Sequence, residues 1–171
     1  ADKLVESYCK SFDLQAVIVR PFNTYGPRQS ARAIIPTIIT QALALDSIKL
    51  GNLDTTRDFT YVSDTVNGFL SAAQAENRSG EVYNLGTGSE ITIGKLAEAI
   101  IRLIGREVSV HIDDARLRPQ KSEVMRLLSD NSRAKAALDW QPTISLEQGL
   151  LQTIEWIKEN LDQFRVGMYE F

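Results

Sequence analysis

Two short apolar runs, far apart in the sequence, most constrain the fold of this chain. Residues 16–21 (AVIVRP) and 81–86 (EVYNLG) are continuous runs rich in β-branched and other apolar residues. Such runs are typical of strands buried on both faces of a parallel sheet. Strands of this kind need neighbours on each side, and further candidates are scarce here. We therefore expect an incomplete sheet, either because the sequence is a fragment or because another chain completes it.

Helical patterns alternate with these strands, which predicts an α/β fold. We expect helices near residues 1–12, 33–45, 63–75, 93–105, 130–138 and 145–161, and further short strands near 48–50, 57–62 and 108–112. The expected helix caps are Ser63 or Asp64, Asp130, the pair Ser145 and Gln148, and a C-terminal Gly105. With neither a repeat nor a linker, the 171 residues are predicted to form a single domain, 1–171.

Charge and cysteine content exclude several classes of protein. The chain has 19 Lys and Arg against 22 Asp and Glu, a net charge of -3, which argues against general binding to nucleic acid or to anionic membranes. Its one cysteine, Cys9, cannot form an internal disulfide, and no Cys/His set suits a metal. No apolar run approaches the roughly 20 residues of a membrane span. We expect a cytoplasmic protein with no metal site.

Two familiar catalytic patterns are absent or incomplete. Gly86-Thr87-Gly88 follows a predicted strand, but Ile91 stands where a dinucleotide-binding loop has its third glycine. A plain turn is the preferred interpretation. His111 is the only histidine, and no GxSxG-type nucleophile motif accompanies it. We therefore predict no catalytic residue from these motifs.

Polar residues near the strand ends are better candidates for ligand binding. Arg57 and Arg118 could supply two guanidinium groups to a diphosphate, each by charge-assisted hydrogen bonds, with surface ion pairs as the alternative. Asn23 lies just past the carboxyl end of a buried strand, where open α/β sheets bind ligands, although it could equally cap a loop. From the residues alone, both interpretations stay open.

Taken together, the motifs resemble the C-terminal part of an extended short-chain dehydrogenase/reductase, of the NAD(P)-dependent nucleotide-sugar epimerase and 4,6-dehydratase type. The resemblance covers nearly the whole chain in the family's order and spacing. It implies the substrate-binding part plus two late strands of a Rossmann-type parallel sheet. The motifs that carry it are VIVRPFNTYGPRQ, AIIPTIITQAL, GNLDTTRDFTYVSD, GEVYNLGTG, RLRPQKSEV and SDNSRAKAALDWQP.

The resemblance also implies roles for individual residues. Arg57 and Arg118 match the arginine pair that clamps the nucleotide diphosphate, and Asn23 matches an asparagine that contacts the phosphate or the sugar. Pro21 falls where the family's backbone passes beside the nicotinamide of the cofactor.

The nucleotide base and ribose have their own expected contacts. Ile35 and Pro36 match the stretch that lines the base pocket. Glu123 resembles the acidic residue that holds the ribose, although the local spacing differs from the commoner RPGD form. The segment RPQKSEV is most similar to UDP-N-acetylglucosamine-type 4,6-dehydratases, whereas GNLDTTRDF is also similar to GDP-mannose 4,6-dehydratases. The base, whether of a UDP-, GDP- or dTDP-linked sugar, is left open.

The sequence departs from the family in lacking the GxxGxxG cofactor loop, the catalytic Ser or Thr and the Tyr-x-x-x-Lys pair; Tyr8 is followed four residues later by Phe12. We expect NAD or NADP to serve the complete enzyme and this chain, truncated or naturally short, to bind neither and to be inactive alone. A UDP-sugar 4-epimerase or GDP-mannose 4,6-dehydratase fragment, a non-catalytic nucleotide-sugar-binding module and a structural remnant are the alternatives. An unpaired strand edge predicts a homodimer.

Overall fold

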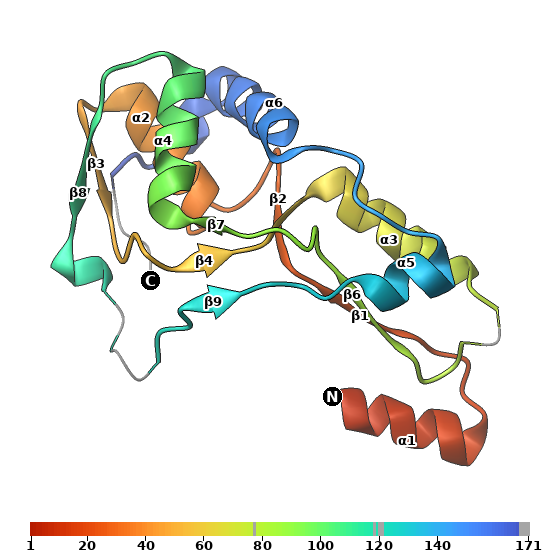
Figure 1. Ribbon diagram of the computed structural model, residues 1–171. Helices are drawn as coiled ribbons and strands as arrows, with labels where there is room; N and C mark the ends of the chain where they lie inside the picture. Colours follow the sequence, from red (N-terminus) through yellow and green to blue (C-terminus); the bar gives the residue numbers. More distant parts are fainter. Residues whose placement is uncertain (77, 118, 120–121, 168–171) are drawn as a thin grey trace. The chain divides into compact units, whose positions relative to one another are not determined.

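A computed structural model describes residues 1–76, 78–117, 119 and 122–167, and it has the expected α/β character (Figure 1). The chain divides into two compact units, each built from three separate segments. The first unit contains residues 1–24, 58–89 and 128–144, and the second contains residues 25–57, 90–127 and 145–171. The single domain expected over 1–171 stays a prediction.

The first unit is built around two parallel strands. β1 (Ile18–Pro21) pairs with β6 (Val82–Leu85) in parallel, which confirms the pairing type expected for these runs. A second pair joins β2 (Asn23–Tyr25) to β5 (Phe59–Tyr61). The helices of this unit are α1 (Asp2–Phe12), α3 (Val62–Gln74) and α5 (Ser132–Leu138), of which α3 contacts β1 and α5 contacts β6.

The core of the first unit forms on one side of this strand pair. Tyr83, Leu85, Ala134 and Trp140 are buried together, and Val17 and Val19 are among the partly buried residues packed against them. β1 itself is less buried than predicted: its first two residues are half-buried and its last two are exposed. The reason is that β6 is its only strand neighbour in the described part of the chain.

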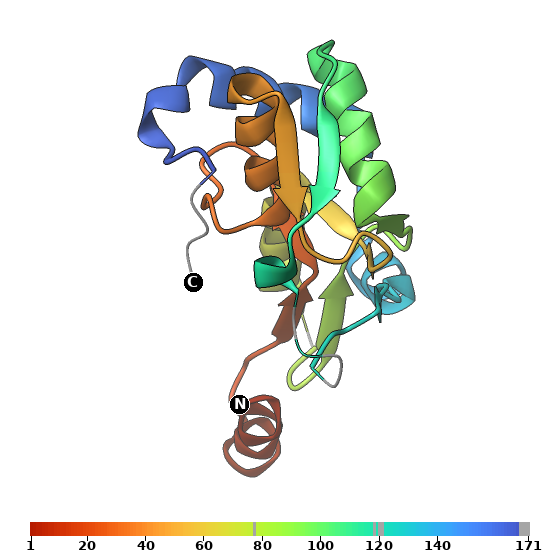
Figure 2. The same cartoon turned by 90° about the vertical axis from the view of Figure 1, so that its left-hand side faces the viewer.

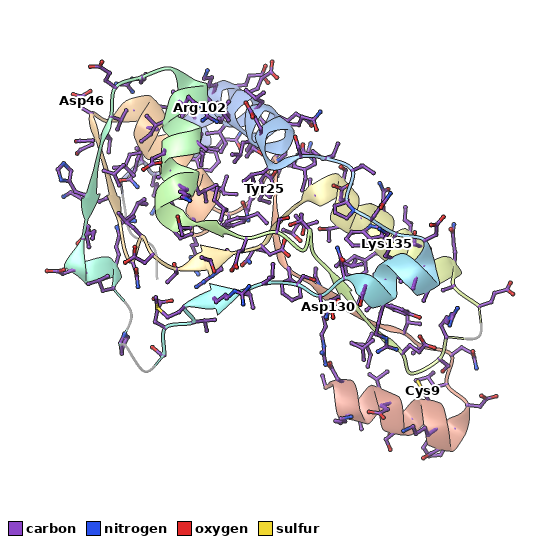
Figure 3. All side chains as sticks on the ribbon, in the orientation of Figure 1. Cys9, Tyr25, Asp46, Arg102, Asp130 and Lys135 are labelled. Atoms are coloured by element: carbon purple, nitrogen blue, oxygen red, sulfur yellow. The ribbon has the colours of Figure 1, made fainter. Side chains whose placement is uncertain are left out.

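Helix α1 carries an exposed apolar face. It has no buried residue, and Leu4, Tyr8 and Phe12 lie largely in solvent, with 73% of Phe12 exposed. Cys9 is half-buried, and its Sγ lies 3.7 Å from the carbonyl oxygen of Ala16 (Figure 3 labels Cys9). The helix is therefore attached through few contacts and leaves apolar surface uncovered.

The second unit contains the remaining helices and two small sheets. β3 (Ser47–Leu50) and β8 (Ser109–Ile112) lie side by side in parallel (Figure 2). The other sheet has β4 (Thr56–Arg57) between β7 (Ile91–Thr92) and β9 (Arg126–Leu127). Its helices are α2 (Ile34–Ala44), α4 (Ile93–Ile104) and α6 (Leu146–Glu159), with short 3-10 turns at Asp114–Arg116 and Leu161–Gln163.

The core of the second unit surrounds α2, which contacts α4, α6 and β3. Its fully buried side chains include Ile38, Ile39, Ile48, Leu96, Ile100, Leu150 and Ile157. Tyr25 is buried here too, and its hydroxyl donates a hydrogen bond to the carbonyl oxygen of Leu146. No helix in the described ranges is long and apolar enough to cross a membrane.

Two of the predicted caps are confirmed. Ser145 and Gln148 form a reciprocal capping box at the start of α6. Gly105 ends α4 in the left-handed conformation, with a φ of 74°, which a residue without Cβ adopts at low cost.

The other two predicted caps are wrong. Helix α3 begins at Val62 without a side-chain cap, because the Asp64 carboxylate instead accepts hydrogen bonds from Thr143 Oγ1 and the Ile144 N–H. At α5 the cap position is Asn131, and Asp130, one residue earlier, accepts from the N–H of Ser132.

Candidate functional site

The carboxyl ends of β1 and β6 bring two polar segments of the first unit together. In the parallel register Pro21 lies opposite Leu85, so Asn23 and the turn that begins at Gly86 both follow the same edge of the pair. Pro21 is exposed at this edge. Ligands of open α/β folds bind at the carboxyl ends of strands, so this is the expected location for a site.

Asp58 is the residue around which this edge is organised. It lies between β4 and β5, so the single strand predicted over residues 57–62 is wrong, and it has no solvent-exposed surface. Its Oδ1 accepts hydrogen bonds from the Thr87 N–H and hydroxyl, at 2.8 and 2.6 Å. Its Oδ2 accepts from the N–H groups of Gly88 and Ser129, at 2.9 and 3.1 Å. One buried carboxylate thus joins three segments of chain.

The Gly86–Gly88 turn has the features of an anion-binding loop, but its anion is internal. Successive backbone N–H groups in such a turn form a concavity that suits a phosphate or a carboxylate. Here the side chain of Asp58 fills it. A Cβ on Gly86 would come within 2.3 Å of Ser129 Cβ, which explains the glycine at this position. The turn therefore serves the fold, as the sequence interpretation preferred.

The side chain of Asn23 is hydrogen-bonded to the backbone of Asp58. Its Nδ2 donates a hydrogen bond to the Asp58 carbonyl oxygen over 3.0 Å. Because a carbonyl oxygen only accepts, this bond fixes which end of the amide faces Asp58. The amide oxygen and the second N–H are left for other partners, which fits the expected contact with a phosphate or sugar.

In the second unit the structure brings Arg57 and Glu123 together. Arg57 is in the central strand β4, and its Nη2 lies 3.4 Å from Glu123 Oε1. The two side chains are only 16% and 13% exposed. Arg57 Nη1 also donates to the carbonyl oxygens of Thr56 and Val124, each at 2.7 Å. Arg57 thus binds the segment that precedes β9. The Nε–H of Arg57 has no acceptor among the described residues.

Ile35, Pro36 and Arg118 are the remaining residues for which the resemblance implies contact with the nucleotide. Ile35 is 1% exposed and Pro36 is also buried, so both side chains belong to the core of the second unit. Any contact with a base therefore has to come from the backbone or from less buried neighbours. Arg118, the other half of the expected arginine pair, lies outside the described residues.

Glu90, which directly precedes β7 in the sheet of β7, β4 and β9, is a further charged residue that the sequence interpretation missed. Its carboxylate accepts from Thr56 Oγ1 at 2.6 Å and from Arg126 Nε at 2.9 Å. The hydrogen bond from Arg126, and secondly that from Thr56, hold the pKa of Glu90 below its usual value. Glu90 thus connects Thr56 of β4 with Arg126 of β9. The sequence offered no signal for this, because Glu90 and Arg126 are far apart in the chain.

Metal chemistry has no candidate site in the described ranges: no three or more His, Cys, Asp or Glu side chains gather there. In the second unit, Arg57 provides a positive charge and Glu123 a hydrogen-bond acceptor. In the first unit, Asn23 has both a donor and an acceptor.

Comparisons with known proteins extend this picture. A family model described as "GDP-mannose 4,6 dehydratase" matches residues 1–153. The human dTDP-D-glucose 4,6-dehydratase is 31% identical over 96% of this chain and 48% of its own length. The UDP-N-acetyl-alpha-D-glucosaminuronate decarboxylase of Bacillus cytotoxicus is 35% identical over 91% of this chain and 51% of its own length.

The fold is found in solved structures as well. The UDP-glucuronic acid 4-epimerase of Bacillus cereus, solved with UDP-glucuronic acid and NAD, matches 93% of this chain and 50% of its own with a TM-score of 0.83 and 29% identity. The chain therefore spans about half the length of the relatives it matches. With its α/β fold and with the family match over most of its length, the chain belongs to the GDP-mannose 4,6-dehydratase family, a group of nucleotide-sugar dehydratases and epimerases within the extended short-chain dehydrogenases/reductases.

Proposed function

We propose that this chain is the nucleotide-sugar-binding portion of an NAD(P)-dependent 4,6-dehydratase that acts on a UDP-N-acetylglucosamine-type substrate. One observation carries the proposal: Arg57 Nη2 and Glu123 Oε1, from the residues that the family resemblance assigns to the diphosphate and the ribose, lie 3.4 Å apart. A guanidinium beside a carboxylate offers complementary groups to a phosphate and to neighbouring hydroxyls. A 4-epimerase is the second candidate, because the B. cereus structure is that of a 4-epimerase.

In binding, each residue has its own task. Arg57 neutralises the diphosphate, with Arg118 as its expected second arm. Glu123 accepts hydrogen bonds from the ribose hydroxyls, and Asn23 binds a phosphate or sugar oxygen through its remaining N–H. Ile35 and Pro36 support the wall beside the base from within the core.

The cofactor is the weakest fit to this chain. NAD or NADP would supply the hydride acceptor of the complete enzyme, and Pro21 is the one residue here assigned to it. The N–H groups of Thr87 and Gly88 are taken by Asp58 and so are not offered to a dinucleotide phosphate. The printed sequence contains neither a Tyr-x-x-x-Lys pair nor a GxxGxxG loop. We therefore propose that the chain alone neither holds the cofactor nor turns over.

Calorimetric titration tests the binding proposal. We would titrate the purified chain with UDP-N-acetylglucosamine, dTDP-glucose and GDP-mannose, and repeat the titration with Arg57→Lys and Arg118→Ala. Lysine keeps the charge of Arg57 but loses the fork of donors, so affinity should fall by about 10-fold or more. Arg126→Ala is the matched control, because Arg126 lies in the adjacent strand β9 and its carboxylate partner is Glu90.

The outcomes separate the possibilities. Saturable binding by one nucleotide class that is weakened in the Arg57 and Arg118 variants, and not in the Arg126 variant, supports the proposal. Equal affinity in all variants, or no binding by a folded chain, contradicts it. Formation of a 4-keto-6-deoxy sugar by the chain with added NAD would contradict the inactivity.

We also propose a cytoplasmic homodimer, in which the exposed apolar face of α1 and the open edge of β1 are covered by a second copy. Light scattering at increasing protein concentration measures the mass directly. A monomer throughout the range would overturn the dimer.

A further inference from the structure

Burial of the Asp58 carboxylate costs free energy unless hydrogen bonds or opposite charges compensate for the lost water. Carboxylates are almost never fully buried unless paired, yet Asp58 has no exposed surface. In the described residues its carboxylate is bound by three backbone N–H groups and one hydroxyl, and by no lysine or arginine. Hydrogen bonds to the charged form can stabilise a buried carboxylate in this way. The result is a rigid connection that a neutral side chain would not reproduce.

The peptide group of Asp58 depends on this connection. Asp58 is the single residue between β4 and β5, so strand pairing holds the residues on either side of it but not Asp58 itself. The carboxylate, anchored to Thr87, Gly88 and Ser129, does so instead. The carbonyl oxygen of the same residue accepts the hydrogen bond of Asn23 Nδ2.

We infer that Asp58 is a positioning residue for ligand binding: its buried carboxylate fixes the peptide group that orients the Asn23 amide. This role rests on the proposed function of Asn23 as a contact to the phosphate or sugar of a nucleotide sugar. Asp58 itself does not touch the ligand. Asp58 affects ligand affinity by orienting Asn23, whereas it affects folding stability by binding the Thr87–Gly88 turn.

A first test needs no ligand. In Asp58→Asn, one carboxylate oxygen is replaced by an NH₂ group, which cannot accept hydrogen bonds from the surrounding N–H and O–H donors. The peptide group of residue 58 should therefore shift. The side-chain amide signals of Asn23, assigned through Asn23→Asp in ¹⁵N–¹H spectra, should move and broaden. Unchanged Asn23 signals in a folded Asp58→Asn protein would overturn the inference.

Asp64→Asn is the matched control. Asp64 belongs to the same unit, is 1% exposed and also accepts hydrogen bonds from a hydroxyl and a backbone N–H, those of Thr143 and Ile144. Its carbonyl oxygen accepts from Trp140 Nε1 and not from Asn23. This variant should lose stability while it keeps the Asn23 signals.

The second test measures affinity for a nucleotide sugar in a double-mutant cycle of Asn23→Ala and Asp58→Asn. If Asp58 acts through Asn23, each variant weakens binding by about 10-fold and the double variant is no weaker than Asn23→Ala. Additive losses would mean a merely structural role and would overturn the inference. Absence of binding by the unchanged protein would refute the proposed function, while the Asn23 spectra would still decide the geometry.

A milder variant covers the case in which Asp58→Asn does not fold. Thr87→Ala removes the hydroxyl that donates to Asp58 Oδ1 over 2.6 Å and keeps the backbone N–H donors. A smaller shift of the Asn23 signals is expected. No shift in this variant would count against the role of Asp58.

Discussion

Replacement of Gly86 by alanine tests how tightly the turn closes on Asp58. An ideal Cβ at this position lies 2.3 Å from Ser129 Cβ and 2.9 Å from Asp58 Oδ2, so something must move. Overpacking of a buried site costs about 1–3 kcal/mol. Displacement of a hydrogen bond to a buried carboxylate costs about 1.5–3 kcal/mol more. We expect Gly86→Ala to lower the free energy of unfolding by about 2.5–6 kcal/mol.

Urea unfolding measures this loss. Trp140 is 3% exposed in the first unit, so its fluorescence in a Trp156→Phe background reports on the unit that contains Gly86. Gly94→Ala is the control, because the nearest atom to its Cβ is 3.5 Å away. Gly94 lies in a helix, and alanine there should stabilise the protein by about 0.5–1 kcal/mol.

A second substitution checks the cause. Ser129→Gly removes the atoms that the new Cβ would strike, and Ser129 Oγ has no hydrogen-bond partner in the described structure. The double variant Gly86→Ala with Ser129→Gly should therefore recover part of the lost stability. A stability of Gly86→Ala within about 0.5 kcal/mol of the unchanged protein, or no recovery in the double variant, would refute the reasoning.

Three further predictions concern the second unit. The hydrogen bond from Arg126 lowers the pKa of Glu90 in the folded state, so ionised Glu90 stabilises the protein above its ordinary pKa of 4.5, and this effect is lost as the pH falls below that value. Glu90→Gln should therefore unfold at a lower urea concentration than the unchanged protein at pH 7. Equal stability of the two proteins at pH 7 would contradict this. Ser145→Ala removes the cap that accepts from the Gln148 N–H and should cost about 1 kcal/mol by thermal unfolding, with Ser145→Asp as the conservative control. Gly105→Ala has space for its Cβ but a φ of 74°, so the left-handed backbone alone should cost about 1 kcal/mol, and no change in the melting temperature would contradict that cause.

The sequence predicted well those features that depend on near neighbours. The strand character of the β1 and β6 runs, the capping box at Ser145 and the helix end at Gly105 each follow from residues within a few positions of one another. The family resemblance implies that Arg57 binds the diphosphate and that Glu123 binds the ribose, and both roles stay predictions. The structure shows that Arg57 Nη2 and Glu123 Oε1 lie 3.4 Å apart.

The features that the sequence did not predict depend on distant partners. Asp58 and Asp64 were assigned to a strand and a helix cap, whereas their carboxylates bind groups far along the chain, at Ser129 and Ile144. Propensity and spacing carry no information about such pairings. Each aspartate is instead recognisable only by its burial, which a sequence does not display.

The interleaving of the two units has a consequence for how the chain is made. The first unit lacks Ser129 and Trp140 until its third segment, 128–144, is complete, and α6 of the second unit comes later still. Neither unit can therefore finish folding before its third segment has been synthesised. No single cut in the chain releases either unit whole. A truncation at residue 127 would damage both at once. Shortened versions for expression should for that reason keep all six segments, and any shortening should be confined to surface loops.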